Sequence, residues 1–174
     1  MKRTWTIKGG HMKPVLFVLI SAVAASAAAA DDRKALVGAW RYAGEVDTRA
    51  DGSPAPASAQ SDTEGLLIYS ASGFMSVVLM PQNREWLSET ATPAELRDTV
   101  ANGTAYAGRY ELDPDTHTVT HITSVSMEPA FQEKRLVRTY DLQGNTLKLT
   151  GTFPYEGTSI RFTITWLRVQ EPRK

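Results

Sequence analysis

Eight short runs of strand-forming residues follow one another between residues 36 and 169. β-branched and aromatic residues dominate these runs, and apolar side chains recur with the short period of strands. The runs are 36–46, 66–70, 74–80, 106–112, 118–127, 136–142, 146–150 and 160–169. Two of the connections, 70–73 and 143–145, have hairpin length and contain a glycine where positive φ is needed. The pattern predicts an all-β, eight-stranded antiparallel up-and-down barrel, with a two-sheet sandwich as the alternative.

One short helix is expected between the third and fourth strands. Thr92, Pro93 and Glu95 are in the order of a helix cap, an N1 proline and a capping-box glutamate, and Gly103 follows as a stop signal. The preceding loop, 81–89, contains a tryptophan, Trp86, that either covers the mouth of the barrel or only pins the loop. Residues 153–157 are expected to form a loop before the last strand.

The first 30 residues have the pattern of a leader that is separate from the folded domain. A basic start at Lys13 precedes an apolar stretch, 15–20, and an Ala/Ser-rich segment up to Ala30. This is the order of a secretory signal peptide. The apolar stretch is too short for a good membrane-spanning helix. The sequence therefore predicts a domain over residues 31–174 that is periplasmic or secreted, without stable membrane insertion after cleavage. Whether Met1 or Met12 is the true start stays open.

Charge and cysteine content exclude several classes of function. The chain has 19 basic and 19 acidic residues, but four of the basic residues precede Asp31, which leaves 15 basic against 19 acidic residues and a net charge of −4 in the mature domain. Such a surface offers no electrostatic footprint for nucleic acid. The chain has no cysteine, so disulfides, thiolate catalysis and cysteine-based metal sites are all excluded.

The first and the last predicted strands each carry a tryptophan with an arginine close by. Gly38 precedes Trp40 by two residues on the first strand, and Arg168 lies on the last. This arrangement resembles the Gly-x-Trp signature of the lipocalins. The resemblance implies that Trp40 closes the floor of the barrel and that an arginine from the last strand, here Arg168, lies across its indole. A guanidinium stacks well on an indole face, which suits this role.

Six segments spread over the domain carry a closer resemblance. They are Gly38-Ala39-Trp40-Arg41, Gly65-Leu66-Leu67-Ile68-Tyr69, Gly73-Phe74-Met75-Ser76, Tyr106-Ala107-Gly108-Arg109-Tyr110, Val119-Thr120-His121 and Thr165-Trp166-Leu167-Arg168. In this order they resemble the motifs of the bacterial lipocalin-like domain family. Ala39 and Phe74 replace the usual Thr and Tyr, and Ile122 stands where members often have a second histidine. The resemblance implies the barrel fold, which hosts many functions.

Alternation along the strands predicts which side chains face the lumen. On the last strand Ile160, Phe162, Ile164 and Trp166 share the apolar face, and on the fifth Val119, His121, Thr123 and Val125 alternate together. The candidate ligand-binding residues are Tyr106, His121, Arg138, Tyr140, Phe162 and Met75. A buried arginine needs an anion or several acceptors, which an acidic ligand supplies. The alternative for Arg138 is that it is exposed or pairs with Glu128 or Glu133. The alternative for His121 is a purely structural role. The alternative for the tyrosines and Met75 is that they only pack in the core.

Three hypotheses follow for the function. The first is a binding protein for a small, largely apolar and possibly acidic molecule. The second is a cofactor-free cyclase or isomerase, with His121 or a tyrosine as the acid–base group beside Arg138, and the third is a packed barrel that serves as an interaction module. No catalytic residue is assigned, and neither a cofactor nor a metal is predicted. His117 and His121 would lie about 13 Å apart on a strand, too far to share a metal ion.

Overall fold

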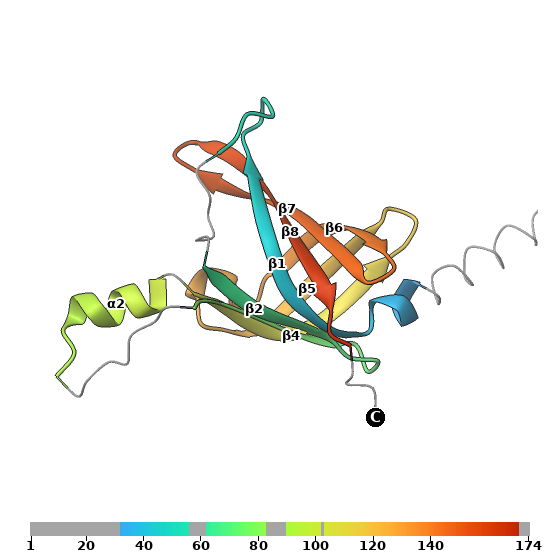
Figure 1. Ribbon diagram of the computed structural model, residues 1–174, viewed down its shortest axis with the longest axis horizontal. Coiled ribbons are helices and arrows are strands. Elements are labelled where there is room, and N and C mark those ends of the chain that lie inside the picture. Colours follow the sequence, from blue (N-terminus) through green and yellow to red (C-terminus); the bar gives the residue numbers. More distant parts are fainter. Residues whose placement is uncertain (1–31, 56–61, 83–89, 102, 171–174) are drawn as a thin grey trace, which may run out of the picture.

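The eight predicted strands form one closed antiparallel barrel in the computed structural model, which describes residues 32–55, 62–82, 90–101 and 103–170. Each strand pairs with its neighbours in chain order, and β1 closes the barrel on β8 (Figure 1). The strands are β1 (Gly38–Thr48), β2 (Thr63–Tyr69), β3 (Phe74–Pro81), β4 (Thr104–Asp113), β5 (Thr118–Ser126), β6 (Arg135–Gln143), β7 (Thr146–Tyr155) and β8 (Thr158–Arg168). The predicted up-and-down barrel is therefore confirmed, and the sandwich alternative is wrong.

Two predictions concern residues outside the described ranges. The leader over residues 1–30 and the loop tryptophan, Trp86, both belong to this group. In the described part of the chain, no helix is both long and apolar enough to cross a bilayer.

The last hairpin is longer than its sequence suggests. Residues 153–155, expected to be loop, continue β7, and only Glu156 and Gly157 form the turn, with φ of 46° and 77°. Two consecutive positive φ values match the right-handed twist of a hairpin. Pro154 pairs with Ser159 on β8, but the pairing of β7 with β6 ends at Thr150. The missing N–H of the proline therefore costs no ladder bond, because no described strand pairs with β7 on that side.

A bulge in β5 overturns one predicted orientation. Ala107 pairs with Val125, but the next residue of β4, Gly108, pairs with Thr123, so Ser124 is an extra residue. Val125 then points outward and is 60% exposed, while Thr123 and His121 are buried. The strict alternation assumed for this strand fails because an inserted residue exchanges the two faces.

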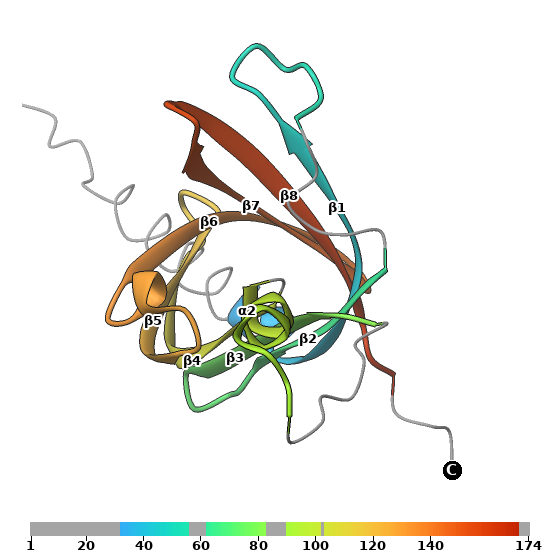
Figure 2. The same cartoon turned by 90° about the vertical axis from the view of Figure 1, so that its left-hand side faces the viewer.

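The predicted helix is α2 (Pro93–Ala101), and its capping box has formed. The backbone N–H and the hydroxyl of Thr92 donate to Glu95 Oε2 at 2.7 and 2.8 Å, and the Glu95 N–H donates back to the Thr92 hydroxyl at 3.3 Å. Figure 1 places α2 beyond one end of the barrel, and Figure 2 looks into the barrel from that end. A short helical segment, residues 32–36, lies at the opposite end.

The end marked by residues 32–36 is closed by Trp40 and Arg168. The two residues pair across β1 and β8, and the Arg168 guanidinium carbon lies 4.0 Å from the centre of the indole, which is fully buried. Gly38 has a φ of +140°, and a Cβ at this position would lie 2.8 Å from Arg168 Nη1. The Gly-x-Trp spacing thus leaves room for the arginine that covers the tryptophan, as the resemblance implies.

Backbone carbonyls of the segment before β1 hold this stack in place. Arg168 Nη1 donates to the Val37 carbonyl at 3.0 Å, and Arg168 Nη2 donates to the Ala35 carbonyl. Trp40 Nε1 donates to the Leu36 carbonyl at 2.9 Å, and Leu36 itself is buried. The segment before β1, the start of β1 and the end of β8 therefore build the floor together.

Truncation of Trp40 tests this floor. Trp40→Ala should lower the free energy of unfolding by ~3–5 kcal/mol, because it deletes a fully buried aromatic side chain and leaves a cavity. Val46→Ala, on the exposed face of the same strand, is the control and should cost less than ~1 kcal/mol. Urea unfolding measures both, and an equal, small effect of the two substitutions would contradict the proposed role of Trp40.

Candidate functional site

A cavity of about 550 Å³ occupies the half of the barrel away from Trp40. Its lining includes residues at the ends of strands that meet near α2, among them Thr63 on β2, Leu79 on β3 and Thr104 on β4. Apolar side chains make up most of the wall: Leu67, Val77, Leu79, Leu136, Leu149, Ile164, Phe131, Phe153, Phe162 and Trp166. Small-molecule sites have this size and this mainly apolar lining.

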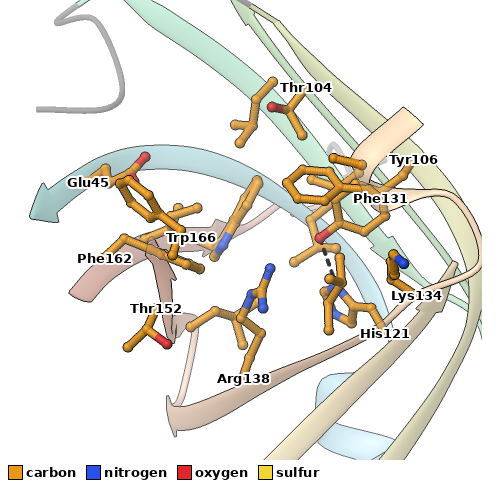
Figure 3. Close-up of a pocket in the computed structure, with 18 of the residues that line it drawn as sticks. Glu45, Thr104, Tyr106, His121, Phe131, Lys134, Arg138, Thr152, Phe162 and Trp166 are labelled. Atoms are coloured by element: carbon orange, nitrogen blue, oxygen red, sulfur yellow. Dashed lines mark hydrogen bonds between the residues drawn. The ribbon is translucent and has the colours of Figure 1, made fainter. Parts of the chain in front are cut away.

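His121 is at the centre of a buried hydrogen-bonded triad. It is 2% exposed and lies on the inner face of β5. The Tyr69 hydroxyl lies 2.6 Å from His121 Nε2, and the Tyr106 hydroxyl lies 3.0 Å from Nδ1. Both ring nitrogens are therefore engaged by hydroxyls, and Figure 3 shows His121 and Tyr106 together on one side of the cavity.

Burial keeps this histidine neutral. Desolvation, followed by the nearby positive charge of Arg138, lowers the pKa of His121 from 6.5 to about 3. Burial likewise raises the pKa of both Tyr69 and Tyr106, an effect that Arg138 partly opposes. At neutral pH the triad therefore consists of uncharged groups near the positive charge of Arg138.

Arg138 lies on the inner face of β6 and lines the cavity. Its guanidinium carbon is 4.9 Å from the centre of the Phe162 ring. Gly151 makes room for this arrangement, because a Cβ there would lie 2.5 Å from Phe162 Cζ and 3.0 Å from Arg138 Cδ. Arg138 Nη1 donates to the Val137 carbonyl at 3.1 Å.

No carboxylate of the described residues pairs with Arg138. The ion pair found in this part of the chain joins Arg135 to Glu111, at 2.6 Å, between exposed side chains. Glu128, one of the partners considered from the sequence, accepts a hydrogen bond from the Thr104 hydroxyl at 2.8 Å. Arg138 is thus a half-buried cation in a largely apolar chamber.

Four of the six candidate ligand-binding residues line the cavity together, namely Tyr106, His121, Arg138 and Phe162. Tyr140 and Met75 are buried but do not line it. Tyr140 does face inward, yet its hydroxyl donates to Asp32 Oδ2 at 2.6 Å, and desolvation followed by this bond raises its pKa. Met75 pairs with Tyr69 and Gly108 in the sheet and belongs to the core.

Three features of the site were not assigned from the sequence. Tyr69 follows Leu67 on the inner face of β2, so alternation could have identified it as a neighbour of His121. Phe131 ends a short 3₁₀ helix, η1 (Pro129–Phe131), between β5 and β6, where no strand pattern places it. Its ring meets Tyr106 edge-on at 5.8 Å, and the Thr123 hydroxyl donates to the Phe131 carbonyl. Trp166 was predicted to face inward, but its buried, unpartnered Nε1 has no sequence signal.

The buried histidine makes stability depend on pH. Between pH 6.5 and 3 the unfolded chain binds a proton at His121 that the folded chain does not bind, so stability falls as the pH falls through this window. The slope contributed is up to roughly 1.4 kcal/mol per pH unit. Urea unfolding at a series of pH values should show a shallower acid slope for His121→Gln than for the unchanged protein.

His117 supplies the matched control for this experiment. It is exposed in the turn between β4 and β5, and asparagine tolerates its φ of 51°. His117→Asn should keep the acid slope of the unchanged protein. A His121→Gln slope that equals that of His117→Asn would contradict the assignment of the acid sensitivity to His121.

Comparison with known proteins agrees with the barrel and its signature residues. The lipocalin-like domain family matches residues 37–169, a span from the segment before β1 to the end of β8. Searches of curated proteins and of solved structures found no match. The family match covers more than half of the chain and includes Gly38, Trp40, His121 and Arg168. The chain therefore belongs to the lipocalin-like domain family.

Proposed function

We propose that this protein is exported and binds a small, largely apolar molecule with an acidic group in the lumen of its barrel. The observation that carries the proposal is a cavity of about 550 Å³ that contains an arginine without a carboxylate partner among the described residues. The apolar walls favour an apolar ligand body, since its transfer from water is favourable. The arginine favours an anionic end, because an unpaired charge in such surroundings is costly.

The volume supports a binding function over a packed barrel. A lumen below about 300 Å³ would be small for a drug-sized ligand, and this cavity is larger. Residues near the strand ends, among them Thr63 on β2 and Thr104 on β4, line the part of the cavity that lies toward the α2 end of the barrel. A packed interaction module is therefore the weaker hypothesis.

The state of His121 supports binding over catalysis. A general acid or base works best with a pKa near the working pH, whereas the pKa of His121 is lowered to about 3. Both of its ring nitrogens already have hydroxyl partners. A cyclase or isomerase that relies on this histidine would have to break one of these bonds first.

Replacement of Arg138 tests the proposed function. The neutral fluorescent probe N-phenyl-1-naphthylamine should bind the lumen of both the unchanged protein and Arg138→Leu. Decanoate should displace it from the unchanged protein, and Arg138→Leu should weaken decanoate on the order of a hundredfold, because a charge-assisted hydrogen bond in an apolar cavity is lost. Methyl decanoate should be affected far less.

Arg109 provides the control arginine. It stacks on Phe74 at 4.4 Å, much as Arg138 stacks on Phe162, but it is exposed on the outer face of β4. Arg109→Leu should leave the affinity for decanoate unchanged. Equal affinities for acid and ester that are unaffected by Arg138→Leu would remove Arg138 from the site, and failure of every probe to bind would reject the proposed function.

The export proposal has a separate test. Protein produced with its full leader in a suitable bacterial host should be recovered from the periplasm or medium with an N-terminus near Asp31. The contacts of Asp32, Ala35 and Leu36 with the barrel support cleavage upstream of these residues, which would leave the floor intact. Intact-mass spectrometry of an uncleaved cytoplasmic product would contradict export.

A further inference from the structure

The hydrogen bonds around His121 determine which group donates to which. A neutral imidazole has one N–H donor and one acceptor nitrogen. Tyr69 is 1% exposed, does not line the cavity, and has His121 as its hydroxyl partner among the described residues. A buried hydroxyl hydrogen without an acceptor is costly, so Tyr69 donates to Nε2. The proton of His121 then lies on Nδ1 and is donated to the oxygen of Tyr106.

This order leaves the hydroxyl hydrogen of Tyr106 unused. Tyr106 lines the cavity, so its O–H can be offered to a molecule inside. Arg138 lines the same cavity, and its positive charge lowers the pKa of Tyr106 against the effect of burial. The guanidinium has five N–H groups, of which one donates to the Val137 carbonyl.

A third donor lies at the same cavity. Trp166 is 1% exposed and lines the cavity, and its buried Nε1–H has no hydrogen-bond partner among the described residues. An indole nitrogen can only donate. In Figure 3 this nitrogen is on the side of the ring that faces the Arg138 guanidinium, while the carboxylate of Glu45 is on the far side of Trp166.

We propose that Arg138, Tyr106 and Trp166 form a donor-only subsite that takes the ionised carboxylate of the ligand, and that Tyr69 and His121 are positioning residues that keep the Tyr106 hydroxyl available as a donor. The proposal rests on the proposed function and specifies its ligand class. A carboxylate has only acceptors when ionised, and its negative charge matches the guanidinium of Arg138, which has no carboxylate partner among the described residues. An amine brings donors and a positive charge, so the subsite rejects it.

The assignment gives Tyr69 a role at a distance. In Tyr69→Phe nothing donates to Nε2, so the tautomer is no longer fixed, and in part of the molecules His121 accepts the Tyr106 hydroxyl at Nδ1. The carboxylate then loses a donor, although Tyr69 never touches the cavity. A residue with only a packing role would change the affinities for neutral and anionic ligands alike.

Binding measurements on the hydroxyl variants test the subsite. Tyr106→Phe should weaken decanoate about tenfold and Tyr69→Phe several-fold, with the affinity for N-phenyl-1-naphthylamine unchanged in both. Decylamine should not bind the subsite. Tyr110→Phe is the control, because Tyr110 packs on Tyr69 with ring centres 4.8 Å apart but donates to the Ser70 carbonyl. It should leave the affinity for decanoate unchanged.

The tautomer of His121 is a second readout that needs no ligand. Nitrogen-15 NMR of the imidazole should show the proton on Nδ1 in the unchanged protein and in Tyr110→Phe, and a mixture of the two tautomers in Tyr69→Phe. Decanoate, but not the neutral probe, should also shift the indole N–H resonance of Trp166.

The possible failures can be told apart. If decanoate binds and depends on Arg138, but Tyr106→Phe weakens decanoate and the neutral probe equally, the subsite is wrong and the proposed function stands. A proton on Nε2 in the unchanged protein overturns the positioning role of Tyr69 and His121. If neither decanoate nor the neutral probe binds the unchanged protein, both proposals fall.

Discussion

The pairing of the first strand with the last, completed by Arg168 over Trp40, is the contact on which the rest of the barrel depends. Without it β1 and β8 would be two free sheet edges, and the lumen would be open along its side. The contact also distinguishes the two ends of the molecule. One end is filled by the indole and by residues 32–36, and the cavity therefore lies toward the other.

Arg168 and Arg138 differ in how their surroundings use the charge and the donors of the guanidinium. Arg168 donates to two backbone carbonyls of the segment before β1 and covers an indole, so its charge and its donors are used within the fold. Arg138 donates to one carbonyl and stacks on Phe162, while its remaining donors lie in an apolar cavity. The neutral His121 adds no charge to compete with it. The cavity is therefore suited to a molecule that brings its own anion.

The sequence predicts the fold well because the barrel depends on regular features. Alternation, hairpin glycines and the capping box at Thr92 are local signals, and each of them appears in the structure. Alternation also predicts that Arg138 and Phe162 face inward. It fails at Val125, where a bulge inserts Ser124, because a bulge leaves no clear mark in the hydrophobic pattern.

The partners of the site residues were harder to predict than their orientation. The Tyr140 hydroxyl donates to Asp32, which is 108 residues away along the chain, and no local sequence pattern predicts such a contact. The assignment of Tyr69 and Tyr106 to opposite nitrogens of His121 depends on the register of four strands. The reason for a glycine at position 151 also becomes visible only in the structure. A side chain there would collide with Arg138 and Phe162, which lie over this position.

Proton linkage during ligand binding tests the central claim most directly. Decanoate is ionised in water at pH 7, and we expect it to stay ionised in the lumen while His121 stays neutral. Calorimetric titrations of decanoate in buffers with different ionisation enthalpies measure the number of protons exchanged. The expected uptake is close to zero at pH 7, with the same observed enthalpy in every buffer. An uptake of about one proton per decanoate would contradict it, because either the carboxyl or His121 would then be protonated in the complex.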